Sequence, residues 1–188
     1  MIEQKFNPLD ILRTRTAALG LPDWFLRQGK GTLTTAVTEI AQLITGRDWA
    51  LIGFDYSDAT YYPAHSGDVS LKVAQACQCL LRSCHNDTVD LVDARAALSD
   101  QPVDTDGVDL PRALTIIPLT FRDQPLMFLA VGSSNSDGPL DPDILAQLHL
   151  LGEITEEINS LRGEMRFLTL DMLDLLKSNI DEDADELV

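Results

Sequence analysis

The chain has 188 residues, of which 45% are hydrophobic and 6% aromatic, and its formal net charge at pH 7 is −16. This composition is typical of a globular protein and excludes a predominantly disordered chain. Fourteen basic residues against thirty acidic ones disfavour nucleic-acid binding, because such a chain repels a phosphate backbone. No window approaches the roughly 18 consecutive apolar residues of a membrane span, and the N-terminus lacks the pattern of a signal peptide. We therefore expect a cytoplasmic protein that binds neither nucleic acid nor a membrane.

The first part of the chain predicts helices. Asn7 and Pro8 are favourable residues for a helix start, and Gly20 is a typical residue after a helix end. We assign residues 1–29 to an N-terminal helical segment. From residue 32 to residue 44, apolar side chains recur at steps of three and four, which predicts an amphipathic helix.

Five short β-rich stretches predict a sheet. They are residues 49–56, 61–65, 88–92, 113–120 and 125–132. The last two form the clearest hairpin of the chain. A helix is expected from Ser70 to about Cys84, and residues 93–110 have the composition of a polar, acidic loop. This order of elements predicts an α+β fold with an antiparallel sheet.

The strongest physical pattern is a heptad repeat in a long helix that starts near Asp141 and continues to about Ser178. Nine of its ten a and d positions are apolar, and Gln147 is the exception. The residues that we assign to dimerisation are Leu151, Ile154, Ile158, Leu161, Met165, Leu168, Met172 and Leu175. A hydrophobic repeat of 3.5 residues predicts a coiled-coil seam with a second helix.

Packing of this stripe on its own domain is the alternative for the first part of the helix, from Ile144 to Ile154. Beyond Leu161 it is harder to satisfy, since about 38 helical residues span roughly 57 Å, more than a small domain. We expect a homodimer, with the helices parallel and the N-terminal segment completing a four-helix bundle; antiparallel pairing stays open. Residues 30–150 are then the main domain, 151–180 the dimerisation helix and 181–188 an acidic disordered tail.

Five stretches, in this order along the chain, resemble the GAF family. They are residues 49–55, 89–95, 114–119, 124–133 and 140–145. They are similar to the family's first strand, its strand and loop before the long connection, the two strands of its last hairpin, and the entry to its last helix. The resemblance covers about residues 30 to 162. It implies a GAF-like antiparallel sheet of about five to six strands flanked by helices, with a long C-terminal coiled-coil helix.

The resemblance also bears on function. Members of the family hold small ligands, such as cyclic nucleotides, bilins, haem or metabolites, between the sheet and its helices, and others are dimerisation modules without a ligand. It therefore implies a regulatory or signalling module, which we expect to be non-enzymatic. The alternative is a ligand-free dimeric scaffold that acts through a protein partner. Because members pass a signal along the last helix to an output domain and none follows here, we expect a protein partner or a missing output domain. No cofactor is assigned.

By analogy with the family, six residues are expected to face a ligand. They are Phe54, Tyr56, Tyr62, His65, Asp93 and Arg95. Aromatic side chains with a few polar groups are typical of ligand pockets. The aromatic residues fit the core or the surface of a sheet equally well. An anion can be clamped by Arg95 or Arg112, unless these are paired at the surface.

No catalytic residue and no metal ligand is assigned. Cys77, Cys79 and Cys84 fall within eight residues of one predicted helix, whereas the family's branch of free methionine sulfoxide reductases uses cysteines in loops. Bilin-binding relatives attach the chromophore at a Cys-His pair shortly before the strand that corresponds to residues 114–119. Here the pair Cys84-His85 lies ahead of an earlier strand, so a covalent bilin at Cys84 is not expected. The histidines are scattered, without the spacing of a nucleophile and its base.

Overall fold

The computed structural model describes residues 33–56, 59–121, 124–135 and 138–161. The N-terminal helical segment predicted for residues 1–29, the acidic tail and the dimerisation residues Met165, Leu168, Met172 and Leu175 lie outside the described residues. Their assignments stay predictions.

The described chain forms one five-stranded sheet in the order β2-β1-β5-β4-β3. The strands are β1 (Trp49–Tyr56), β2 (Ala59–Ser66), β3 (Val89–Leu91), β4 (Ala113–Phe121) and β5 (Gln124–Ser133). All four neighbouring pairs of this sheet are antiparallel. The predicted α+β class and antiparallel sheet are therefore confirmed.

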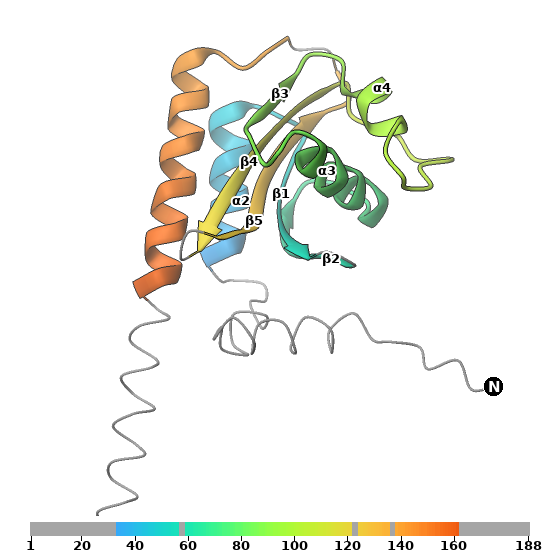
Figure 1. Cartoon of the computed structure of the whole chain (residues 1–188). Coiled ribbons are helices and arrows are strands. Elements are labelled where there is room, and N and C mark those ends of the chain that lie inside the picture. Colours follow the sequence, from blue (N-terminus) through green and yellow to red (C-terminus); the bar gives the residue numbers. More distant parts are fainter. Residues whose placement is uncertain (1–32, 57–58, 122–123, 136–137, 162–188) are drawn as a thin grey trace, which may run out of the picture.

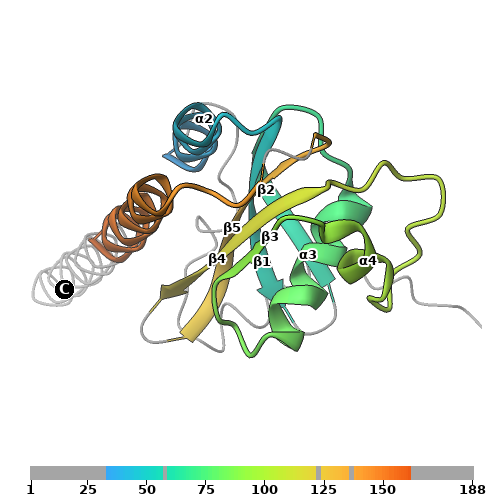
Figure 2. The same ribbon diagram turned by 90° about the horizontal axis from the view of Figure 1, so that it is seen from above.

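Helices cover both faces of the sheet (Figures 1 and 2). They are α2 (Leu33–Thr45), α3 (Leu71–Ser83), α4 (Ala94–Ser99) and the C-terminal helix, residues 142–161. One face carries α2 and the C-terminal helix, side by side, and the opposite face carries α3 and α4. None of these described helices combines the length and the apolar character needed to cross a membrane.

Side chains of the central strands alternate between two separate cores. In β1, Ala50, Ile52 and Phe54 join the core under α2 and the C-terminal helix, whereas Trp49 and Leu51 join the core under α3 and α4. Successive side chains of a strand point to opposite faces, so a sheet covered on both sides needs apolar residues at nearly every position. This explains why the sequence of β1 is almost continuously apolar.

A glycine in β5 makes room for the Trp49 indole at the start of β1. Trp49 and Gly132 are cross-strand partners, and a Cβ atom at Gly132 would lie 2.2 Å from Cζ2 of Trp49. No side chain fits at that distance, so the ring packs directly on the backbone of β5. Gly132 thereby fixes the position of an aromatic ring at the edge of the α3 face.

Helix α3 begins and ends with recognisable local signals. The hydroxyl of its N-cap residue, Ser70, accepts a hydrogen bond from the backbone N–H of Val73 at 3.3 Å. After the helix, His85 and Asn86 have left-handed backbones, with φ of 58° and 61°. The Asn86 N–H donates to the carbonyl of Leu81 at 3.0 Å, which satisfies a free carbonyl of the last turn.

The prediction of a loop over residues 93–110 is wrong in its first part, because helix α4 lies there. Two of its side chains, Ala94 and Leu98, are fully buried in the core under α3 and α4. Positions four residues apart lie on the same side of a helix, so this pair anchors one side of α4. A six-residue helix is too short to show a periodic pattern, and tertiary packing rather than local sequence stabilises it.

Candidate functional site

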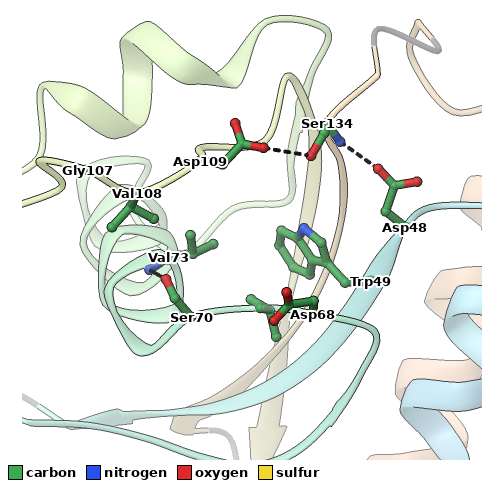
Figure 3. A pocket seen from close by; sticks show the side chains of 10 residues that line it. Asp48, Trp49, Asp68, Ser70, Val73, Gly107, Val108, Asp109 and Ser134 are labelled. Atoms are coloured by element: carbon green, nitrogen blue, oxygen red, sulfur yellow. Dashed lines mark hydrogen bonds between the residues drawn. The ribbon is translucent and has the colours of Figure 1, made fainter.

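A cleft of about 430 Å³ opens on the α3 face, where β1 begins and β5 ends (Figure 3). The connection from β2 to α3, the first turn of α3 and the loop before β4 complete it. Its lining residues are Asp48, Trp49, Asp68, Val69, Ser70, Val73, Gly107, Val108, Asp109 and Ser134. Three of them are aspartates and none is a lysine or an arginine. We call this space the acidic cleft.

Hydrogen bonds to two of the aspartates hold the end of β5 in place. One carboxylate oxygen of Asp48, Oδ2, accepts from the Ser133 hydroxyl at 3.0 Å and from the Ser134 backbone N–H at 2.8 Å. The Ser134 hydroxyl donates to Asp109 at 3.4 Å. Figure 3 shows Ser134 between these two carboxylates. The acidic cleft is therefore bounded on this side by fixed oxygen atoms.

The loop before β4 is attached to both helices of this face. The Lys72 ammonium of α3 binds Asp104 at 3.0 Å, and the Arg95 guanidinium of α4 binds Asp109 at 3.3 Å. The hydrogen bond from Lys72, together with one from the Asp106 backbone N–H, lowers the pKa of the Asp104 carboxyl. Both ion pairs are exposed, so they orient the loop more than they stabilise the fold.

A second cleft, of about 500 Å³, lies beside the first turn of α4 and is lined by Val92, Asp93, Arg95, Ala96 and Arg112. Arg95 is already engaged there, since its Nε atom donates to the Leu110 carbonyl at 3.1 Å in addition to the Asp109 ion pair. An anion in the second cleft would compete with these internal partners. The two clefts meet at the Arg95–Asp109 pair.

The residues predicted to face a ligand do not form one group. Asp93 and Arg95 line the second cleft together. Phe54 is fully buried in the core on the opposite face of the sheet, under α2 and the C-terminal helix. His65 is exposed on β2, and its Nδ1 atom lies 3.2 Å from the Gly67 carbonyl oxygen. The backbones of residues 56 and 62 belong to β1 and β2, but the side chains of Tyr56 and Tyr62 lie outside the described part of the chain.

The residues of the acidic cleft were missed by sequence reasoning. Asp48 precedes β1 and Asp68 follows β2, and a hairpin brings those two positions to one edge of a sheet, as the pairing of Ala50 with Ser66 demonstrates. Asp109 reaches the same edge only because β5 lies next to β1. Acidic residues flanking a predicted hairpin were the available signal for the first two, and no local signal exists for the third.

The three thiols of α3 and its C-cap differ in burial. Cys77 is fully buried in the core under α3 and α4, and this burial raises its pKa to about 12. A neutral, buried thiol is a poor nucleophile. Cys79 and Cys84 are half-buried and unbridged. Within the described ranges, no three histidine, cysteine, aspartate or glutamate side chains are placed so that they could hold a metal ion.

Cys77 is expected to react with thiol reagents only after unfolding. In a variant with Cys79→Ser and Cys84→Ser, an aromatic disulfide reagent at pH 8 should leave the native protein unlabelled and label one thiol in guanidinium chloride. At pH values between the ordinary pKa of 9.0 and the raised pKa of about 12, the Cys77 thiol stays protonated in the folded protein, whereas it loses its proton in the unfolded chain. Stability should therefore fall as the pH rises through that window, which pH-dependent urea titrations measure. Rapid labelling of the native variant would contradict the burial.

No model of a protein family matches the sequence, and no curated protein sequence matches it. Solved structures do match the fold. The PixJ GAF domain of Thermosynechococcus elongatus, in its blue-light-absorbing form, has a TM-score of 0.55 at 12% identity, covering 88% of this chain and 95% of that chain. GAF3 of a Synechocystis protein, in its photoproduct state, has a TM-score of 0.53 at 12% identity, with coverages of 73% and 95%.

A type II free methionine-R-sulfoxide reductase from Thermoplasma acidophilum is similar too, with a TM-score of 0.50, 14% identity and coverages of 66% and 88%. At such identities the likeness concerns the fold, since one fold hosts unrelated activities. The five-stranded antiparallel sheet and its helices on both faces agree with the expected architecture. The chain therefore has the GAF fold.

Proposed function

We propose that the chain is a non-enzymatic regulatory module that forms a homodimer through its helices and takes a small ligand on the α3 face. The main support for the dimer is an apolar surface on the outward sides of α2 and the C-terminal helix. Five of the seven exposed large hydrophobic side chains in the described part of the chain belong to these two helices. They are Ile40, Leu43, Leu150, Ile154 and Leu161.

The exposed fractions are large for leucine side chains. Leu43 is 80% exposed, Leu150 is 55% exposed and Leu161 is 52% exposed. Single exposed hydrophobic residues are normal on a protein surface, but several on neighbouring elements are typical of interaction sites. The two helices lie side by side over one face of the sheet (Figures 1 and 2), so their exposed residues can contact one partner.

The C-terminal helix has two different apolar or small-residue stripes. One stripe contacts its own domain and includes Leu148, Gly152 and Thr155, all buried. The heptad seam is displaced from it by one residue, which is about 100° around the helix. In that seam Leu151 is half-buried and Ile154 is exposed. Packing on the sheet therefore leaves part of the seam exposed. The alternative, in which the whole stripe packs on its own domain, does not account for the exposed Ile154.

A second copy of this chain is the occupant that the pattern favours. Beyond the described part, the sequence repeats the same seam at Met165, Leu168, Met172 and Leu175. A heptad repeat is self-complementary, because each a or d residue of one helix fits between four residues of an identical helix. The residues of the seam carry no charge, so the like charges of two copies lie outside the line of contact.

Two glutamates in the seam should separate the dimer. We expect the double variant Ile154→Glu/Leu161→Glu to raise the dimer dissociation constant about 100-fold or more, since charges would be buried in an apolar interface. Analytical ultracentrifugation over a dilution series measures it. Circular dichroism should stay unchanged, because both side chains are exposed in the single chain.

The matched control is Ala146→Glu/Ser160→Glu, which adds the same charges to the same helix at heptad position c. It should leave the dissociation constant within about threefold of that of the original chain. A chain that is monomeric at micromolar concentration, or a control that dissociates like the seam variant, contradicts the dimer.

The ligand-free scaffold is supported by a different observation. The space between the sheet and α3 is filled by buried side chains, among them Leu51, Leu81, Leu114 and Phe128. A bilin-sized ligand in the middle of that face would have to displace this core. Room for a ligand exists at the rim, in the acidic cleft. The non-enzymatic reading is supported by the buried state of Cys77, although a free methionine-R-sulfoxide reductase shares the fold.

A further inference from the structure

We propose that the acidic cleft binds a small organic amine, as an ammonium ion attached to an apolar body. The inference deepens the proposed function, since it names the chemical class of the ligand on the α3 face. It rests on three features of the cleft: unbalanced negative charge, an indole donor without an acceptor among the described residues, and an apolar wall.

The charged side chains that line the cleft are all acidic. Asp48, Asp68 and Asp109 contribute three carboxylates, and no lysine or arginine of the described chain lines the space. Arg95 offsets part of the charge of Asp109 from outside the cleft. Asp68 makes no hydrogen bond or ion pair with any residue that the structure describes. An ammonium group is attracted by such a lining and an anion is repelled.

The indole of Trp49 carries a donor that has no acceptor among the described residues. The side chain is 5% exposed and lines the cleft, yet no described residue accepts a hydrogen bond from its Nε1–H. In Figure 3 the indole nitrogen lies on the edge of the ring that faces Ser134, and the three carboxylates stand on different sides of the ring. Although the ring is buried, its Nε1 atom keeps contact with solvent in the cleft, so it is free to donate to a ligand oxygen there.

The remaining wall is apolar and the volume suits a small molecule. Val69, Val73 and Val108 line the space beside the indole ring. A volume of about 430 Å³ lies within the range of small-molecule pockets. The aspartates are not grouped as metal ligands in the described residues, which disfavours a bare metal cation. An ammonium, an uncharged oxygen and a carbon skeleton together satisfy all three features.

Tyramine is a suitable probe, because it joins an ammonium and a hydroxyl through an aromatic ring. Two molecules of the same shape serve as comparisons: the neutral tyrosol and the anionic 4-hydroxyphenylacetate. The Trp24→Phe variant of the full chain leaves Trp49 as its single tryptophan. Titration of its fluorescence, excited beyond the absorption of phenols, reports binding at this ring.

Tyramine is expected to bind at least about tenfold more tightly than tyrosol, and 4-hydroxyphenylacetate should leave the fluorescence unchanged. Asp68→Asn should weaken tyramine binding about five- to tenfold without loss of folding, since its carboxylate has no described partner. Asp109→Asn is the second variant and should weaken it as well. The control is Asp87→Asn, which removes the same charge beyond the other end of α3 and should have no effect.

Equal affinities for tyramine and tyrosol would overturn the inference, and so would equal losses in Asp68→Asn and Asp87→Asn. A fluorescence change with calcium chloride but none with tyramine would assign the cleft to a metal ion instead. The dimer is measured separately by ultracentrifugation. Loss of amine binding in an intact dimer therefore refutes only this inference, and a monomer that binds tyramine refutes only the dimer.

Discussion

Phe54→Ala lowers the free energy of unfolding by about 3–5 kcal/mol, the range typical of a large aromatic residue removed from a core. Phe54 is fully buried and packs in the cluster that also contains Val37 of α2 and Leu148 of the C-terminal helix. Its loss leaves a cavity between the sheet and both helices. Urea unfolding at fixed protein concentration measures the change as a lower midpoint with an unchanged m-value.

His65→Ala is the matched control for Phe54→Ala, since both residues were predicted to face a ligand. His65 is exposed on β2, so its removal should change stability by no more than about 0.5 kcal/mol. A loss below about 1 kcal/mol for Phe54→Ala would contradict its place in the core and return it to the list of ligand contacts.

Leu98→Ala is expected to cost about 2–5 kcal/mol, although α4 has only six residues. Leu98 is fully buried, and it is the larger of the two side chains that hold α4 against the core on the α3 face of the sheet. Loosening α4 also breaks the Arg95–Asp109 pair that orients the loop before β4, so Val108 and Asp109 are no longer held at the acidic cleft and tyramine binding should weaken. Thermal or urea unfolding and the Trp49 titration measure the two effects.

Leu71→Ala provides the same chemical change at an exposed position of α3, where Leu71 is 45% exposed. Its effect on stability should stay below about 1 kcal/mol. Similar losses in the two variants would mean that α4 contributes no more to the core than an exposed turn does.

Local patterns were sufficient for most of the elements. Strand β1 was predicted at residues 49–56 and has those bounds, and α3 was predicted from its Ser70 start to about Cys84. Such predictions succeed because a strand covered on both faces is apolar throughout, and because a helix cap is a hydrogen bond between near neighbours in sequence. The period of the heptad seam is equally visible without any partner, and its pairing with a second helix stays a prediction.

The candidate site could be predicted only in part. Asp93 and Arg95 do line a cleft together, because α4 holds them within one turn. Phe54 was separated from them by the sheet, since its side chain points to the face that α2 covers. Sequence alone shows that strand residues alternate, but it does not show which set meets which helix.

By itself, then, the sequence determined the α+β class and most of the strands and helices, and it predicts a seam for a second helix. Tertiary structure alone decided that β5 inserts beside β1, which brings Ser134 and Asp109 to the Trp49 indole. It also decided that α4 is a helix. The physical reason is the same in both cases: local hydrogen bonds and periodicity are encoded within a few residues, whereas burial depends on contacts between segments far apart in the chain.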